Sequence, residues 1–306
     1  MIDRDEFSAW LRLLETPGVG RESARALLAR FGSPEAALAA PTGARKEVVG
    51  SAVAGALSRV PDQFAARRDA GWQWLADGDE PRDAIVVGDP RYPQLLLDAA
   101  DPPLLLYVRG RIELLQAPAV AVVGSRNPTP QGLDNARAFS AHLSQAGWVV
   151  VSGLAFGVDA AAHEAALAGG TGTIAVVGTG LDVVYPGRHR ALTARIAAEG
   201  LVVSEFAIGT PALPENFPIR NRIIAGLARG TLVVEARDVA EVWVDGVSTG
   251  LTTPTLGFHV KVGEHMVELR TPSGERSLPR TVKVTRGQTL RVALALPAPP
   301  PGRSQP

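Results

Sequence analysis

Three polar, glycine-containing segments follow apolar runs in this chain, and their residue types suit phosphate binding. They span residues 122–126 (VVGSR), 150–157 (VVSGLAFG) and 216–222 (NFPIRNR). Glycine allows a ligand to approach the backbone closely, helix N-termini attract anions, and an arginine guanidinium can hold a phosphate through two hydrogen bonds. Buried parallel strands read as continuous Val/Ile/Leu runs, and their carboxyl ends line the ligand crevice of an open α/β sheet. The sequence therefore predicts that the three segments converge on a phosphate-binding edge.

The charged side chains of these segments favour a polyanion over a single nucleotide. Arg126 comes directly after an apolar run, among small polar residues, and so cannot belong to the core. Arg220 and Arg222 flank an asparagine where a helix is expected to begin. Separate phosphate subsites suit an extended nucleic-acid backbone, and Phe217 could stack a base without reading sequence. The alternative is a solvated loop in which the arginines pair with Glu205 or Glu215.

Nucleotide cofactors fit the chain poorly. Gly178-Thr179-Gly180 follows a predicted strand, but Val183 stands where the third glycine of a dinucleotide-binding loop would fall. No lysine lies between Lys46 and Lys261, so the chain has no Gly-Lys-Ser/Thr loop for ATP. We expect no cofactor.

Hydrolytic or metal chemistry has no better support. A hydrolase needs a nucleophile or base that a third group orients. Asp159 and His163 lie four residues apart and could share a helix face, but alanines surround them, which favours a helix cap and a structural histidine. The five histidines form no ligand-like cluster with carboxylates, so we expect no metal and no catalytic residue.

Bulk properties exclude strong global attraction to nucleic acid or membrane. The chain of 306 residues has 31 basic and 31 acidic residues, a formal net charge of +0, so any anion site must be local. Cysteine is absent, the first residues are charged, and no apolar run approaches the ~18 to 20 residues of a membrane span. We expect a cytoplasmic protein without a membrane partner.

The pattern of apolar residues predicts an α/β protein with three domains. Residues 1–80 read as helical, and the Gly18-Val19-Gly20 turn between two helices suggests a helix-hairpin-helix, or SAM-like, domain. Such a turn can present N–H groups to a nucleic-acid phosphate, but a plain helical hairpin explains it equally well. Residues 84–236 alternate between strands and helices, which predicts an extended Rossmann-like parallel sheet. Residues 238–296 read as a small antiparallel β domain, and residues 297–306 as a disordered proline-rich tail.

Within residues 84–236 the expected elements have definite bounds. The strands are predicted at 119–123, 149–152, 173–177, 201–204 and 231–235. The helices are predicted at about 131–146, 158–168, 189–199 and 219–228. In the β domain, Asp245-Gly246 is a strong hairpin signal.

Many of these motifs, in this order, resemble the DprA/Smf family. The resemblance covers about residues 90–236 and rests on these motifs: Tyr92-Pro93, Asp101-Pro102-Pro103, Val123-Gly124-Ser125-Arg126, Ser152-Gly153-Leu154-Ala155, Gly157-Val158-Asp159, Ala162-His163, Gly180-Leu181-Asp182, Tyr185-Pro186, Ser204-Glu205 and the run from Phe217 to Gly226. It implies a non-enzymatic protein that binds single-stranded DNA, protects incoming strands in natural transformation and loads the RecA recombinase. The DNA-binding residues that it implies, which include those derived above, are Gly124, Ser125, Arg126, Gly153, Gly157, Phe217, Arg220, Asn221 and Arg222.

The chain departs from the family pattern after residue 236. The family continues with another helix and strand, whereas here residues 237–240 lead into the β domain, which is similar to a PEGA domain. The missing part helps to complete the family's sheet and dimer surface, so homodimerisation and RecA loading are open questions for this chain. The strand at 231–235 would present an unpaired edge unless the β domain covers it. A natural fusion and a sequence error both explain such a junction.

Two other functions remain possible from the sequence. A nucleotide-processing enzyme such as a nucleoside-monophosphate phosphoribohydrolase would need a Pro-Gly-Gly-x-Gly-Thr loop with a following glutamate. Residues 169–173 (GGTGT) lack both the proline and the acid. The other possibility is a chimera that acts only as a scaffold.

Overall fold

The computed structural model describes most of the chain. It covers residues 2–77, 80–99, 101–229, 231–235, 240–252, 260–271, 276–285 and 289–294. These residues form two compact units, one from residues 1–116 and 175–223 and the other from residues 117–174 and 224–306. The predicted disordered tail lies outside the described residues, and the three domain boundaries stay a prediction.

The first unit begins with the predicted helical segment. Its helices are α1 (Arg4–Leu14), α2 (Arg21–Phe31), α3 (Pro34–Ala39), α4 (Thr42–Leu57) and α5 (Phe64–Ala76). Asp3 caps α1, because its carboxylate accepts hydrogen bonds from the N–H groups of Asp5 and Glu6. Gly18 adopts φ +85° in the turn between α1 and α2, a conformation that glycine reaches without strain. The two helices and the turn between them thus form a helical hairpin, which both alternatives from the sequence share.

The rest of the first unit combines short strands and helices. These elements are β1 (Arg82–Val86), α6 (Gln94–Leu97), β2 (Leu105–Gly110), η1 (Ile112–Gln116), η2 (Gly187–His189), α9 (Arg190–Glu199), β6 (Leu201–Ser204) and the start of α10 (Asn216–Leu227). Strand β2 pairs antiparallel with both β1 and β6. The sheet is therefore mixed, since antiparallel strands extend the predicted parallel sheet at this end.

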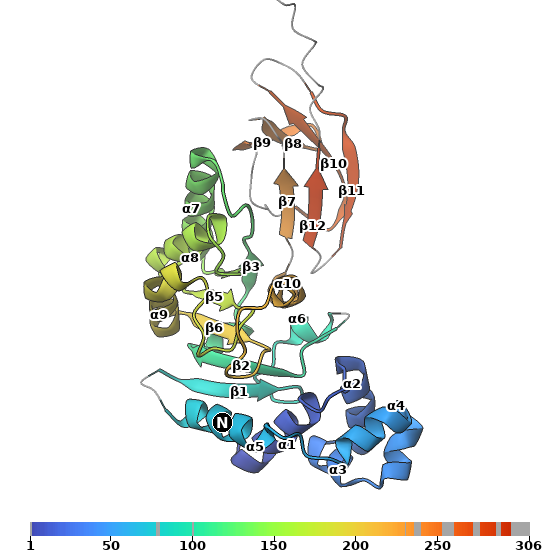
Figure 1. Cartoon of the computed structure of the whole chain (residues 1–306). Helices are drawn as coiled ribbons and strands as arrows, with labels where there is room; N and C mark the ends of the chain where they lie inside the picture. The colour runs from blue at the N-terminus through green and yellow to red at the C-terminus, as the bar shows by residue number, and fades with distance from the viewer. Residues whose placement is uncertain are drawn as a thin grey trace, which may run out of the picture. The chain divides into compact units, whose positions relative to one another are not determined.

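The second unit contains the parallel part of the sheet. Its first elements are β3 (Ala119–Ala121), α7 (Pro130–Gln145), β4 (Val149–Ser152) and α8 (Val158–Gly169), and β5 (Thr173–Val176) follows. Strands β3 and β4 pair in parallel, with Val120 opposite Val150. Helices α7 and α8 lie side by side (Figure 1), and their close approach depends on Gly169, where a Cβ would lie 2.5 Å from the Cβ of Ser144.

The six strands of the sheet follow the order β1-β2-β6-β5-β4-β3. The predicted strands and helices at 149–152, 201–204 and 158–168 are confirmed to within a residue. Two expectations about this region are wrong. Helix α10 begins at Asn216 rather than at residue 219, and the strand at 231–235 is not part of this sheet.

The β domain contains a four-stranded antiparallel sheet, as predicted. Its strands are β8 (Glu241–Val244), β9 (Val247–Thr252), β10 (Gly263–Arg270) and β11 (Arg280–Val284), in the order β11-β10-β8-β9. Asp245 and Gly246 connect β8 and β9 with φ +52° and +78°. Positive φ at both central positions defines the hairpin turn that Asp-Gly favours, so this prediction is confirmed.

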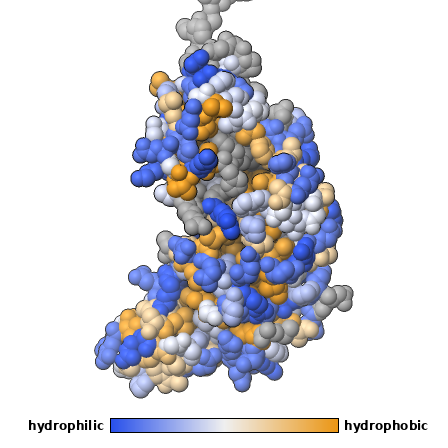
Figure 2. Space-filling view, turned by 180° about the vertical axis from the view of Figure 1, so that it is seen from behind, coloured by the Kyte–Doolittle hydropathy of each residue, from blue (hydrophilic) through white to orange (hydrophobic). Residues whose placement is uncertain are grey.

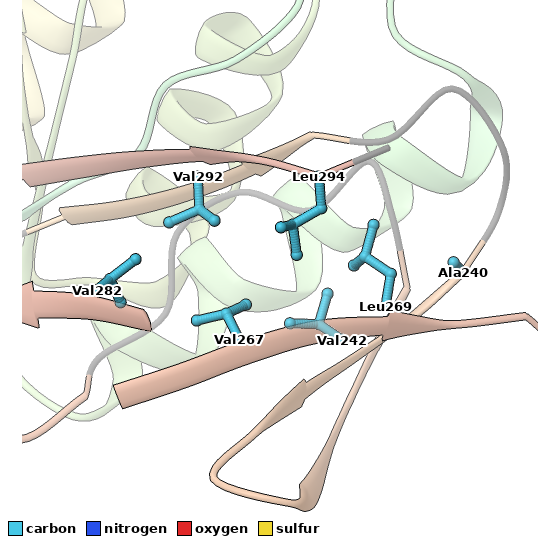
Figure 3. Packing of buried hydrophobic residues seen from close by; sticks show 7 residues of the cluster. All are labelled: Ala240, Val242, Val267, Leu269, Val282, Val292 and Leu294. Carbon is cyan, nitrogen blue, oxygen red and sulfur yellow. The ribbon is translucent and has the colours of Figure 1, made fainter. Parts of the chain in front are cut away.

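Strand β7 (Thr231–Glu235) pairs with the last strand of the β domain instead of with the larger sheet. Its partner β12 (Thr289–Ala293) runs parallel to it, with Val234 opposite Val292 (Figure 1). Figure 3 shows Val292 and Leu294 pointing toward Val242 and Val267 of β8 and β10, with which they form a buried cluster. Burial of each such side chain contributes about 1.5–3 kcal/mol, so β12 is fixed by packing as well as by pairing.

Hydrophilic and hydrophobic residues are interspersed on the face of the molecule that Figure 2 shows. Across the described residues, no helix combines the length and the apolar character needed to cross a membrane.

Candidate nucleic-acid interface

The loop after β3 carries the first group of predicted binding residues. Gly124, Ser125, Arg126 and Asn127 are all exposed. The Ser125 hydroxyl accepts a hydrogen bond from the N–H of Asn127 at 3.1 Å, which fixes the local turn. Among the described residues, none forms a salt bridge or hydrogen bond with the Arg126 side chain. Its guanidinium is therefore available to an anion from solvent.

Gly157 holds this loop in place. It precedes α8 with φ +79°, and a Cβ at this position would lie 2.5 Å from the carbonyl oxygen of Ser125 and 2.7 Å from Cδ of Pro128. The N–H of Val158 donates to the same Ser125 oxygen at 3.2 Å. The structure brings Gly157 together with Ser125 and Arg126 as the sequence predicts, and its visible contribution is to support their backbone.

Gly153 lies at the start of the loop between β4 and α8, which Gly157 ends. Its backbone N–H is bound within the protein. Its N–H and that of Ala155 donate to the Asp159 carboxylate at 3.1 and 3.3 Å. Between them, Leu154 is buried with φ +57°. Asp159 thus ties the β4–α8 loop to the first turn of α8, which is the structural role that the sequence indicates for it.

His163 also fits a structural role. It is completely buried, and its Nδ1 shares a hydrogen bond of 2.8 Å with the hydroxyl of Thr173. That hydroxyl donates to the carbonyl of Val150 at 2.6 Å. The histidine therefore connects α8 with two strands and does not face solvent as a general base would.

The second group of predicted residues lies in the first two turns of α10, within the first unit. Phe217 is half-buried and rests on Gly178, where a Cβ would lie 3.1 Å from the phenyl ring. Its ring centroid lies 5.2 Å from that of Tyr185, which is 48% exposed. The two rings form an aromatic surface open to solvent. Tyr185 is missed by residue-level reasoning, because 32 positions separate it from Phe217 in the chain.

Arg220 is not presented to solvent. It is only 4% exposed, its guanidinium donates to the carbonyl of Val176, and its Nε donates to Oδ1 of Asn221 at 3.0 Å. It therefore anchors α10 to the end of β5. Asn221 itself is exposed.

Arg222 forms the salt bridge that the sequence leaves open as an alternative. Its two terminal nitrogens donate to the two carboxylate oxygens of Glu205, both at 2.6 Å, and its Nε lies 3.3 Å from Asp101. A bidentate pair of this kind is among the stronger polar contacts in proteins. Direct phosphate binding by Arg220 and Arg222 stays a prediction, and their visible contacts are internal.

The ion-pair network around Arg222 contains further residues that sequence reasoning did not find. Arg21 and Arg25 of α2 both contact Asp101, at 2.6 Å each. Burial by itself would raise the pKa of Asp101, but the hydrogen bond from Arg25 and the charges of Arg21 and Arg222 hold this pKa below its usual value. Asp101 is therefore ionised at neutral pH.

A metal ion needs several His, Asp or Glu side chains close together. In the part of the chain that the structure describes, no three His, Asp or Glu side chains lie close enough to bind one.

Three known protein families match successive parts of the chain, and the second and third matches overlap. Residues 4–66 match a DprA-like N-terminal HHH domain, residues 83–240 match DNA recombination-mediator protein A, and residues 229–299 match a PEGA domain. The second match spans half of the chain and contains both groups of predicted binding residues.

Individual relatives show the same similarity. Protein Smf of Synechocystis sp. is 47% identical over 156 residues, which cover 50% of this chain and 39% of the relative. DNA processing protein DprA of Streptococcus pneumoniae is 48% identical over 154 residues, which cover 50% of this chain and 54% of the relative. The chain thus spans about half or less of these relatives' length.

A solved structure extends the comparison to the fold. The X-ray structure of DNA processing protein A (DprA) from Streptococcus pneumoniae matches with a TM-score of 0.63 and 34% identity. The match covers 74% of this chain and 76% of that chain. Because the match to DNA recombination-mediator protein A spans half of the chain, the chain belongs to this family, and the relatives it matches are named DprA or Smf.

Proposed function

We propose that this protein binds single-stranded DNA without acting on it chemically, and that it serves DNA uptake or recombination. The observation that carries the proposal is the exposed Arg126 on a loop whose backbone is fixed by Gly157. A guanidinium that no described residue engages can accept a phosphate without first breaking an internal contact.

The aromatic surface adds a second kind of contact. An unstacked base of a single strand can stack on the rings of Phe217 and Tyr185, and such stacking tolerates any base. Phosphate binding and stacking both leave the hydrogen-bonding edges of the bases unread. We therefore expect binding that depends on strandedness and salt but little on sequence.

The main rival is an enzyme that processes nucleotides. The carboxylate of Asp159 and Nδ1 of His163 are committed to internal hydrogen bonds, which favours a binding role. An assay for base release from nucleoside monophosphates should show no turnover above the rate without protein.

The downstream steps that the family resemblance implies are part of the same proposal. They are protection of incoming strands, loading of RecA and assembly as a homodimer in the cytoplasm. Since the chain spans only part of its relatives, each step needs its own test, such as RecA filament formation on coated DNA in the presence of this protein.

Arg126→Ala tests the binding proposal. Fluorescence anisotropy with several unrelated labelled oligonucleotides, over a series of salt concentrations, should show similarly weakened binding to all. The slope of log K against log salt should flatten by about 0.7, the contribution of one phosphate of a single strand.

Arg137→Ala is a matched control. Arg137 is an exposed arginine of the same unit, but it already pairs with Asp134 at 3.2 Å. Its removal should leave the salt slope unchanged. Equal effects of the two substitutions, or wild-type binding by Arg126→Ala, would refute the role of the loop.

A further inference from the structure

Helix α2 contributes two arginines to a charged cluster in the first unit. Nε of Arg21 lies 2.6 Å from Oδ2 of Asp101, and Nη1 of Arg25 lies 2.6 Å from Oδ1 of the same carboxylate. Arg222 approaches Asp101 from α10 at 3.3 Å. We call Arg21, Arg25 and Arg222 the arginine cluster, and Asp101 is the carboxylate that they share.

The cluster holds more positive than negative charge. Its three guanidinium groups face two carboxylates, and one of these, Glu205, is nearly buried and paired on both oxygens with Arg222. Arg21 reaches Glu205 only at 3.6 Å. Asp101 therefore balances the charge of Arg21 and Arg25 almost alone.

Arg21 and Arg25 have unused hydrogen-bonding capacity that faces water. Their side chains are 40% and 33% exposed. A guanidinium carries five N–H donors, and the contacts of each arginine engage no more than two of its nitrogens. These ion pairs are only partly buried, so the exposed part of each guanidinium can still donate hydrogen bonds to a ligand in solvent.

We propose that the arginine cluster is an additional phosphate-binding surface for single-stranded DNA, and that Asp101 occupies it until a phosphate takes its place. A phosphate accepts the same charge-assisted hydrogen bonds from arginine as a carboxylate does, and two of its oxygens can likewise pair with one guanidinium. The inference rests on the proposed function and extends it to the helical segment, whose part in binding the sequence leaves open.

Asp101→Asn tests the inference, since asparagine keeps the shape of the side chain and removes the competing charge. The variant should bind single-stranded oligonucleotides up to about fivefold more tightly, the equivalent of one exposed charge pair. The slope of log K against log salt should become steeper by about 0.7.

Asp89→Asn is the matched control. Asp89 belongs to the same unit and pairs with Arg91 at 2.6 Å, so this change removes the same charge away from the arginine cluster. Its binding should match that of the wild type. Adding Arg21→Gln and Arg25→Gln to Asp101→Asn should abolish the gain in affinity.

The outcomes separate this inference from the proposed function. Failure of the wild type to bind single-stranded DNA would refute the function itself. Wild-type binding together with an unchanged or weakened Asp101→Asn variant would overturn only the phosphate-binding role of the cluster. If Asp101→Asn does not fold, Arg25→Gln alone decides: weaker binding with a flatter salt slope supports the inference, and unchanged binding overturns it.

Discussion

Replacing Gly157 with alanine should damage both the stability of the second unit and its binding of DNA. The added Cβ would lie 2.5 Å from the carbonyl oxygen of Ser125, 2.7 Å from Cδ of Pro128 and 2.9 Å from the carbonyl carbon of Arg126. Two of these three atoms belong to the backbone, so no side-chain rotation can relieve the contacts. Either the loop moves, or the clash remains.

The size of the effect follows from two separate costs. Alanine at φ +79° and ψ −119°, a region outside the left-handed α basin that residues with a Cβ rarely adopt, loses about 1–3 kcal/mol relative to glycine. The overpacked Cβ adds about 1–3 kcal/mol. The free energy of unfolding should therefore fall by about 2–6 kcal/mol. If the loop moves to relieve the clash, the loss of stability is smaller. Ser125 and Arg126 are then displaced, and the affinity for DNA should fall instead.

Gly170→Ala separates the two costs. Gly170 ends the same helix, α8, with φ +93°, but a Cβ there would meet no atom within 4 Å. This variant should lose only a conformational cost, about 1–2 kcal/mol for the left-handed α region in which Gly170 lies, and should bind oligonucleotides like the wild type. Urea denaturation measures the stability of both variants, and fluorescence anisotropy measures their affinity. If Gly157→Ala is no less stable than Gly170→Ala and binds DNA normally, the loop does not depend on Gly157.

Two further predictions concern the aromatic surface and the β domain. Phe217→Leu and Tyr185→Leu should each weaken oligonucleotide binding by about 1–3 kcal/mol per lost stacking contact, but should not affect a strand with abasic sites. An equal loss on the abasic strand would show that the rings do not stack bases. In the β domain, hydrogen bonds to Asp245 and to the carbonyl of Lys261 raise the pKa of His265 above its usual value of about 6.5. The resulting stabilisation is complete below pH about 6.5 and disappears as the pH rises through the raised pKa, so thermal unfolding of the wild type should shift to lower temperature over this range. His265→Gln should remove that shift, and its persistence would exclude the histidine as the cause.

Local sequence pattern was sufficient for most individual elements of this fold. The apolar run at residues 149–152 and the alanine-rich segment after it contain their own signals of strand and helix, and both elements form there. The Asp245-Gly246 turn is equally local, because positive φ at two consecutive positions is a property of those residues. Such elements need no information from distant parts of the chain.

Apart from the start of α10, the features that escaped prediction depend on contacts between distant residues. Asp101 is 76 positions from Arg25 and 121 positions from Arg222, so no periodicity or motif connects them. The same limit explains why the sequence leaves the partner of Arg222 open between a ligand and Glu205. The sequence shows which charged residue follows a strand, but the fold determines which side chain or ligand forms a salt bridge with it.

Strand β7, which ends just before the junction, pairs with β12, the last described strand of the β domain. The descriptions of DNA recombination-mediator protein A and of the PEGA domain both include residues 229–240, which contain β7. The β domain closes one edge of β7 with β12, and β12 is itself held by the cluster that contains Val242, Val267 and Val292. An unpaired β7 would have offered an exposed edge for aggregation. An accidental shift of reading frame would not be expected to yield a strand that pairs with β7 and, in the same segment, alternating apolar residues that build a buried core. The packing therefore favours a natural fusion over a sequence error.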